Sequence, residues 1–214
     1  MRSLEKLEKP EVLRDNEEAW LGEYLADRDS NAKRYRYRHP DIKQRLKEET
    51  GLKCVYCESK IGHNTPGDIE HKIPSSKDVS KHFDWNNLTI SCTECNRRKN
   101  DYYREGEEFL DPYSDNVEQW LEHHGPLVYW KAGNVRAEIS IRKLELNGEA
   151  RAPLIFRKIE KLDALANVIE RWSNEGNDTL KSLLLLQIRE MSSVRSEYSA
   201  MILSVLKSKG ITIA

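Results

Sequence analysis

Two Cys-x-x-Cys pairs constrain this chain more than any other feature of its sequence. Cys54 and Cys57 form the first pair, and Cys92 and Cys95 form the second. Each pair brings two thiolates to one side of a tight turn, so all four can converge on one ion in the tetrahedral geometry that zinc (Zn²⁺) prefers. The spacing therefore predicts a structural zinc centre that joins two distant segments.

The segment between the pairs carries side chains that a purely structural zinc site does not require. Glu70 directly precedes His71 within the run Asp68-Ile-Glu-His-Lys-Ile-Pro74, and Asn96 directly follows the last cysteine. Taken alone, His71 is more often a histidine that packs in a core than a catalytic one. The sequence pattern around His71 reverses that expectation.

The local sequence pattern predicts a ββα unit around these residues. Two strands are expected near 68–72 and 88–91, and Thr93 can cap a helix that runs to about Arg104. Asn96, Lys99 and Asn100 would then share one helical face.

This pattern resembles the HNH (ββα-metal) endonuclease family in its zinc-stapled form, over about residues 51–103. The resemblance implies that Glu70 and Asn96 hold a catalytic Mg²⁺ or Mn²⁺ and that His71 is the general base. It also implies that Asn87 orients the histidine loop and that Lys99 lies near a phosphate oxygen. Glu70 replaces the more common Asp, and Asn96 replaces the more common His, so Asp68 is a fallback ligand.

Phosphodiester hydrolysis itself requires a second metal ion here. A zinc ion with four thiolate ligands has no open position for water or phosphate. Imidazole suits the base role because its ordinary pKa of about 6.5 leaves it mostly neutral near pH 7. Four other histidines match no family position and are expected to be surface or packing residues, although His82 lies in the loop that faces the site: His63, His82, His123 and His124.

Charge is distributed unevenly along the chain although the formal net charge is −1. Residues 1–30 carry nine acidic and five basic side chains, whereas residues 31–60 carry nine basic and four acidic ones. The basic block includes Arg36 and Arg38, which alternate with Tyr35 and Tyr37, a composition that can bind phosphates and stack on bases. The alternative is a solvated, half-buried extended segment. Arg97 and Arg98 are either phosphate contacts or a solvated helix face.

The expected fold class is α+β, with a treble-clef-like HNH core at 51–104 between an N-terminal helical and basic extension (1–50) and a C-terminal region (105–214). Apolar spacing predicts helices within 3–26, with a possible break at Pro10, and at 40–49. A short helical piece is expected at 117–121, and the alternation at 127–141 predicts a β-hairpin. Two long helices, 153–172 and 178–209, are expected to pair antiparallel.

A closer resemblance links the chain to the HNH nuclease subunits of Septu-type and retron-associated anti-phage systems (PtuB-like proteins). It rests on Tyr56-Cys57-Glu58, Ile69 to Pro74 and Asp111-Pro-Tyr113. It implies a partner ATPase of the ABC/SMC type and a role in bacterial defence. Leu183 to Leu186 form an unbroken apolar row that either completes the core or docks such a partner.

The sequence alone leaves two functions open. The first is a metal-dependent nuclease acting on nucleic acid, with DNA favoured over RNA. The second is a zinc-stabilised module that binds nucleic acid or protein without catalysis. No apolar run approaches the ~20 residues of a membrane span, and a cytoplasmic location is expected because the cysteines suit a metal site in a reducing compartment.

Overall fold

The computed structural model describes residues 1–62 and 66–213, so His63 lies outside the described residues. At its centre is the expected ββα unit. Strands β1 (Asp68–His71) and β2 (Leu88–Ser91) pair antiparallel, with His71 opposite Leu88. Between them, two short 3₁₀ turns, η2 (Val79–Lys81) and η3 (Trp85–Asn87), form the loop.

Helix α4 (Thr93–Lys99) follows β2 and is shorter than the sequence predicts. Its N-cap is Cys92, whose Sγ accepts a hydrogen bond from the Cys95 backbone N–H. The helix ends because Asn100 adopts a φ of 49°, in the left-handed region that asparagine tolerates better than most residues. Asn100 therefore does not extend the helical face of Asn96 and Lys99.

The N-terminal extension contains α1 (Glu11–Ala26), α2 (Asn31–Arg34), the 3₁₀ turn η1 (Tyr35–Arg38) and α3 (Pro40–Glu49). Helix α3 has the predicted bounds. Residues 1–10, however, form no helix. Pro10 is the N-cap of α1, and the residues before it lie extended across the HNH unit.

Specific contacts hold this extended segment in place. The Lys6 ammonium pairs with the Glu49 carboxylate at 3.0 Å and donates to the Leu88 carbonyl. The Trp85 indole N–H donates to the Leu7 carbonyl. These tertiary contacts replace the hydrogen bonds of a helix, which explains why the apolar spacing of residues 3–9 is misleading here.

The hairpin of the C-terminal region lies earlier in the chain than predicted. After α5 (Val117–Trp120), strands β3 (Leu121–His124) and β4 (Leu127–Trp130) pair antiparallel around Gly125 and Pro126. Residues 135–143 form helix α6 instead of the expected second strand. The Asn134 side chain caps this helix, and Ala137 and Ile141, four residues apart, are both buried, so the alternating pattern also satisfies a helical face.

The C-terminal helices are η4 (Glu149–Arg151), α7 (Ala152–Asn174), α8 (Asp178–Ser192) and α9 (Ser199–Ser208). The second predicted long helix is thus broken at residues 193–198. The HNH unit causes this break: Gly51 packs so closely that a Cβ would lie 2.8 Å from the Arg195 Cα, and Lys53 donates to the Ser196 carbonyl. Helices α7 and α8 pair antiparallel as expected.

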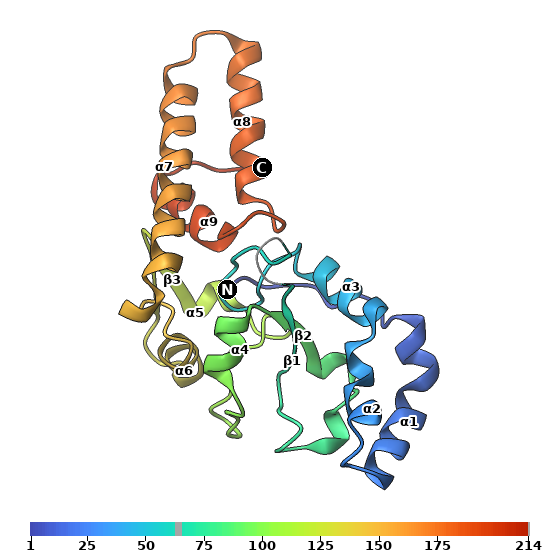
Figure 1. The fold of residues 1–214 in the computed structure, drawn as a ribbon. Coiled ribbons are helices and arrows are strands. Elements are labelled where there is room, and N and C mark those ends of the chain that lie inside the picture. Colours follow the sequence, from blue (N-terminus) through green and yellow to red (C-terminus); the bar gives the residue numbers. More distant parts are fainter. Residues whose placement is uncertain (63–65, 214) are drawn as a thin grey trace.

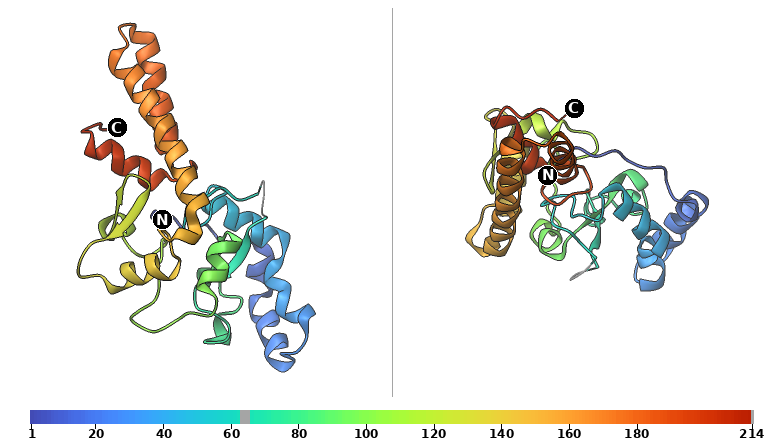
Figure 2. Two further views of the ribbon diagram at one scale, coloured as in Figure 1. Left: turned by 60° about the vertical axis from the view of Figure 1, so that its left-hand side comes forward. Right: turned by 90° about the horizontal axis from the view of Figure 1, so that it is seen from above.

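The elements surround the ββα unit on two sides. Helices α1 to α3 lie on one side of it, and the α7–α8 hairpin projects away from the body on another (Figure 1). Figure 2 shows the same projection from a second direction, with α9 and the β3–β4 hairpin at its base. Among the described residues, no helix has both the length and the apolar character needed to cross a membrane. The mixed α and β composition agrees with the expected fold class.

Candidate active site

The four cysteines form one compact cluster. Their Sγ atoms all lie within 4.8 Å of one another, and those of Cys57 and Cys92 are 3.8 Å apart. Four Zn–S bonds of about 2.3 Å in a tetrahedron require sulfur atoms about 3.8 Å apart. The donor set and its spacing therefore fit one structural zinc ion.

Residues far along the chain surround these thiolates. Both terminal nitrogens of Arg151 lie 3.6 Å from Cys95 Sγ, and the same side chain donates to the Leu144 carbonyl. The Ser59 hydroxyl lies 3.3 Å from Cys57 Sγ and bonds in turn to the Tyr198 hydroxyl. Nothing in the sequence pattern marks Arg151 or Tyr198 as neighbours of the cluster.

His71 occupies the end of β1 and is oriented by a backbone carbonyl. Its Nε2 lies 2.8 Å from the His82 carbonyl oxygen. Because a carbonyl only accepts, Nε2 carries the proton, and Nδ1 is left as an acceptor in the neutral ring. Burial, followed by the nearby His82 imidazole, lowers the pKa of His71 to about 4. The ring is therefore neutral and able to accept a proton near pH 7.

His82 belongs to this site, whereas its lack of a matching family position predicts a surface or packing residue. Its ring stacks on that of His71 with centroids 4.9 Å apart. Its Nε2 donates to the Arg34 carbonyl at 2.7 Å, and its Nδ1 bonds to the Ser75 hydroxyl at 2.5 Å. His82 thus connects the loop that orients His71 to helix α2, a contact that no local spacing indicates.

Asn87 holds the other side of the same loop. Its Oδ1 accepts from the Ile73 backbone N–H, and its Nδ2 donates to the carbonyls of Ile73 and Lys81. The side chain is buried. These contacts fix the chain just beyond His71.

The two carboxylates of β1 have different partners. Glu70 is 4% exposed, and its Oε1 lies 2.5 Å from the Lys99 ammonium. Burial raises the pKa of Glu70 to about 7, although Lys99 opposes that shift. Asp68 is partly exposed and accepts a hydrogen bond of 3.4 Å from the Asn96 amide.

Lys99 is therefore placed differently from the expected phosphate contact. Its side chain is buried, and its ammonium donates to the His71 carbonyl at 2.8 Å besides pairing with Glu70. Both interactions hold the Lys99 ammonium in the protein interior.

The remaining predicted basic residues lie in three places. Arg38 lines the cleft beside His71, with its guanidinium over the Tyr35 ring. Arg36 turns away and pairs with Glu23 of α1. Arg97 and Arg98 lie on α4, where Arg97 pairs with Glu94 and Arg98 with Glu145. Two further basic residues, Arg34 and Lys43, also line the cleft.

These side chains border an open cleft of ≈ 740 Å³. Among its lining residues are the acceptor His71 and three oxygen donors, Asp68, Glu70 and Asn96. Carboxylate and amide oxygens suit Mg²⁺ or Mn²⁺, and a solvent-filled cleft leaves room for the waters that Mg²⁺ retains. The donor set therefore fits a hard divalent ion next to the acceptor.

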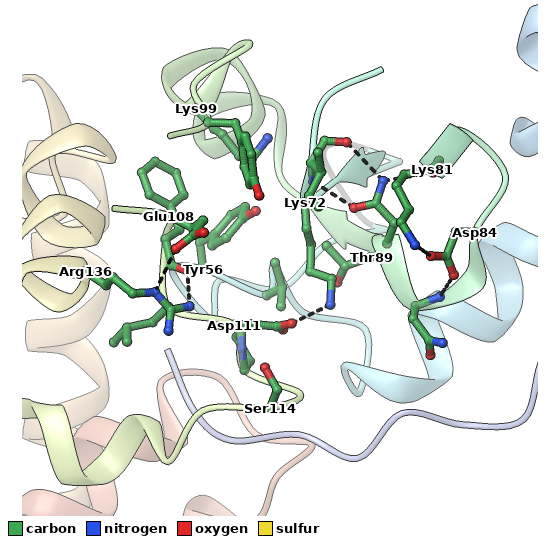
Figure 3. Close-up of a pocket in the computed structure, with 18 residues that line it drawn as sticks. Tyr56, Lys72, Lys81, Asp84, Thr89, Lys99, Glu108, Asp111, Ser114 and Arg136 are labelled. Atoms are coloured by element: carbon green, nitrogen blue, oxygen red, sulfur yellow. Dashed lines mark hydrogen bonds and ion pairs between the residues drawn. The ribbon is translucent and has the colours of Figure 1, made fainter. Parts of the chain in front are cut away.

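A second cavity of ≈ 280 Å³ shares no lining residue with this cleft. Lys72, Lys99, Asp111 and Arg136 are among the residues that line it (Figure 3). Lys72 pairs there with Asp111 at 2.6 Å. Because Glu70 and His71 line the cleft while Lys72 and Lys99 line this cavity, the end of β1 and Lys99 form the partition between the two.

Comparison with known proteins connects this arrangement to a family. A family model described as HNH endonuclease matches residues 54–102. The chain is 27% identical over 180 residues to the Septu protein PtuB of Bacillus thuringiensis, a match that covers 78% of this chain and 68% of that protein. It is also 27% identical over 210 residues to the Septu protein PtuB of Bacillus mycoides (strain KBAB4), with 79% and 66% covered.

The chain thus spans about two thirds of the length of these curated relatives. The matched segment begins at the first cysteine and includes β1, β2 and α4. Those elements build both the cysteine cluster and the cleft around His71, so residues 54–102, the segment that matches the HNH endonuclease family model, carry the candidate site.

Proposed function

We propose that the protein is a divalent-metal-dependent endonuclease that hydrolyses nucleic-acid phosphodiester bonds and leaves 5′-phosphate and 3′-hydroxyl ends. The orientation of His71 carries this proposal. Its protonated Nε2 is held by the His82 carbonyl, so the free Nδ1 is the atom that can take a proton from water. Asp68, Glu70 and Asn96 line the same cleft as this acceptor.

Each residue then has a defined task. His71 accepts the proton of the attacking water, while Asn87 and the His82 main chain keep the imidazole in place. At least two of the oxygen donors Asp68, Glu70 and Asn96 would hold one Mg²⁺ or Mn²⁺, which when bound would neutralise charge on the phosphate and the leaving oxygen. Arg38, Arg34 and Lys43 bind the phosphate backbone at the rim of the cleft.

We further propose that residues 51–104 are the catalytic unit and that the flanking regions, 1–50 and 105–214, support it and bind partners. The similarity to Septu protein PtuB supports a role in bacterial anti-phage defence. Septu-type nuclease subunits imply an ABC/SMC-type ATPase partner. The projecting α7–α8 hairpin could dock it, because Phe156, Leu180, Leu183 and Leu186 are exposed there.

The substrate is a nucleic-acid backbone, and both DNA and RNA must be tested because the proposed mechanism requires no 2′-hydroxyl. The test is to incubate the purified full-length protein, with and without the co-expressed ATPase, with plasmid DNA or tRNA in Mg²⁺, Mn²⁺ or EDTA. Cleavage should require the divalent ion and disappear in His71→Ala. Binding of nucleic acid in EDTA with no cleavage under any condition would instead identify a zinc-stabilised binding module.

A further inference from the structure

The two carboxylates of β1 compete for the role of metal ligand, and their surroundings differ. Asp68 and Glu70 are two residues apart, so they project from the same face of the strand toward α4. Glu70 is already paired with the Lys99 ammonium at 2.5 Å, and both side chains are 4% exposed. Asp68 is partly exposed to the cleft and contacts only the neutral amide of Asn96, at 3.4 Å, among the hydrogen bonds of the described residues.

Lys99 makes the Glu70 pair part of the main-chain framework. Its ammonium donates at 2.8 Å to the carbonyl of His71, so Glu70, Lys99 and the end of β1 form one connected group. Lys99 lines the second cavity, where Figure 3 draws it, and is not among the residues that line the cleft. The pair therefore spans the partition, with Glu70 at the wall of the cleft and Lys99 at the second cavity, and it ties the end of β1 to α4.

We infer that Asp68 and Asn96 are the protein ligands of the divalent ion, whereas Glu70 is a positioning residue that acts on His71 through Lys99. This inference rests on the proposed nuclease function and assigns the roles within that site.

Electrostatics favours this assignment. A carboxylate that turns from Lys99 toward a cation leaves the ammonium buried and without its counter-ion, and removing one partner of a buried ion pair is strongly unfavourable. The unpaired ammonium would also lie close to a second positive charge. Asp68 can turn toward a cation without breaking an ion pair, because its hydrogen-bond partner Asn96 is neutral and the bond between them is long.

Asn96 can join Asp68 by a simple rotation. Its Nδ2 donates to Asp68, and rotation of the amide by about 180° presents Oδ1 to the cleft in its place. One carboxylate and one amide oxygen leave the remaining positions of an octahedral ion for water and phosphate oxygens, as Mg²⁺ prefers.

The experiment is a titration of the full-length zinc-loaded protein with Mn²⁺ alone, followed by the EPR signal of free Mn²⁺ and without nucleic acid. Asp68→Asn should weaken Mn²⁺ binding by at least about tenfold, because loss of a direct ligand costs no less than loss of its supporting contacts. The pair-neutralising variant Glu70→Gln/Lys99→Met should bind within about threefold of the parent, because replacing both partners of a buried pair is nearly neutral.

Glu70→Gln alone is a second variant in case the double variant does not fold, since the Gln amide oxygen can still accept from Lys99. It should lower kcat for DNA cleavage and lower the melting temperature, because the buried Lys99 ammonium loses its counter-ion, while leaving the Mn²⁺ affinity unchanged. That separation distinguishes positioning from ligation, and zinc content near one per chain confirms that each variant is folded.

Loss of Mn²⁺ affinity in Glu70→Gln with normal affinity in Asp68→Asn would overturn the assignment while leaving the nuclease proposal intact. A parent protein that cleaves DNA equally well in EDTA would overturn the metal-dependent function, and the ligand assignment with it.

Discussion

Arg151 places both terminal guanidinium nitrogens 3.6 Å from the Sγ of Cys95, 56 residues away along the chain. Four thiolates and one Zn²⁺ carry a net charge of −2, so a buried guanidinium beside them offsets part of that charge. Arg151 belongs to η4, immediately before α7. The C-terminal region is therefore coupled to the stability of the HNH unit as well as covering it.

Arg151→Leu should accelerate zinc loss, because the variant removes this compensating charge. We expect zinc release to a chromogenic chelator to be about 10- to 100-fold faster, together with a lower melting temperature. Arg157→Leu, at an exposed position on α7, is the matched control and should behave as the parent does. Equal release rates in the two variants would show that Arg151 does not support the metal centre.

His71 should remain an effective base at mildly acidic pH. Burial holds its pKa at about 4, below the ordinary value of 6.5, so the neutral ring persists as the pH falls through 6.5. At saturating Mg²⁺, the acidic limb of the pH–rate profile should therefore have an apparent pKa below about 5.5. A limb centred near 6.5 would indicate a solvent-exposed imidazole.

The same shift makes folding stability depend on pH. The unfolded chain protonates His71 near 6.5 and the folded protein only near 4, so stability is greatest above 6.5 and declines as the pH falls toward 4. The contribution is about 3 kcal/mol over that interval. Urea unfolding of the parent and of His71→Phe at pH 7 and 4.5 measures it, and the variant should lose less stability.

His82→Phe tests the connection between the orienting loop and α2. Phenylalanine retains an aromatic ring but removes the bonds to the Arg34 carbonyl and the Ser75 hydroxyl. A loosened loop displaces the His82 carbonyl and with it His71, so cleavage should fall on the order of 10²-fold. Zinc content should be unchanged, and His124→Ala, a change at an exposed side chain, should cleave normally.

Arg38 and Arg36 form a matched pair for substrate binding. Arg38 faces the cleft, whereas Arg36 is paired with Glu23. Arg38→Ala should weaken DNA binding and reduce the slope of log K against log salt concentration by about 1. Arg36→Ala should leave both nearly unchanged. Fluorescence anisotropy at several salt concentrations in Ca²⁺ measures both variants without cleavage, and similar losses would place both arginines on the DNA.

Substitutions at Leu183 and Leu184 test partner docking and core packing on α8 separately. Leu183 is 57% exposed and Leu184 is 6% exposed. Leu184→Ser should destabilise the protein by about 2–4 kcal/mol because it opens a cavity and buries a hydroxyl. Leu183→Ser should leave the melting temperature unchanged and abolish co-purification with the ATPase. Retained co-purification would exclude this face of α8 as the docking surface.

Local sequence patterns predict much of the catalytic unit. The cysteine spacing anticipates the cluster, the run from Asp68 to Pro74 anticipates β1, and Pro40 marks the start of α3. Each of these features depends on residues close together in the chain or on a fixed donor geometry. The apolar periodicity predicts helices α7 and α8 for the same reason, since the residues that define a long amphipathic helix are close together in the chain.

Local sequence patterns mispredict secondary structure where residues far away in the chain provide alternative contacts for the same segment. Residues 1–10 lie extended because Lys6 and Leu7 find partners at Glu49 and Trp85, and the last predicted helix breaks where residues 193–198 pack on Gly51. Residues 135–143 fit both a strand and a helix by spacing. Their Asn134 cap and the neighbouring buried surface decide for the helix.

The sequence by itself determined which chemical groups are available: four thiolates, the Glu70-His71 pair, and the amides of Asn87 and Asn96. Only the tertiary structure decided how they are paired, because contact between residues far apart depends on the packing of whole elements. That packing buries Glu70 against Lys99, turns Asp68 toward Asn96, brings Arg151 to Cys95 and joins His82 to Arg34. Ion pairing and desolvation then set which of the available groups can face a metal ion and which must stay within the framework.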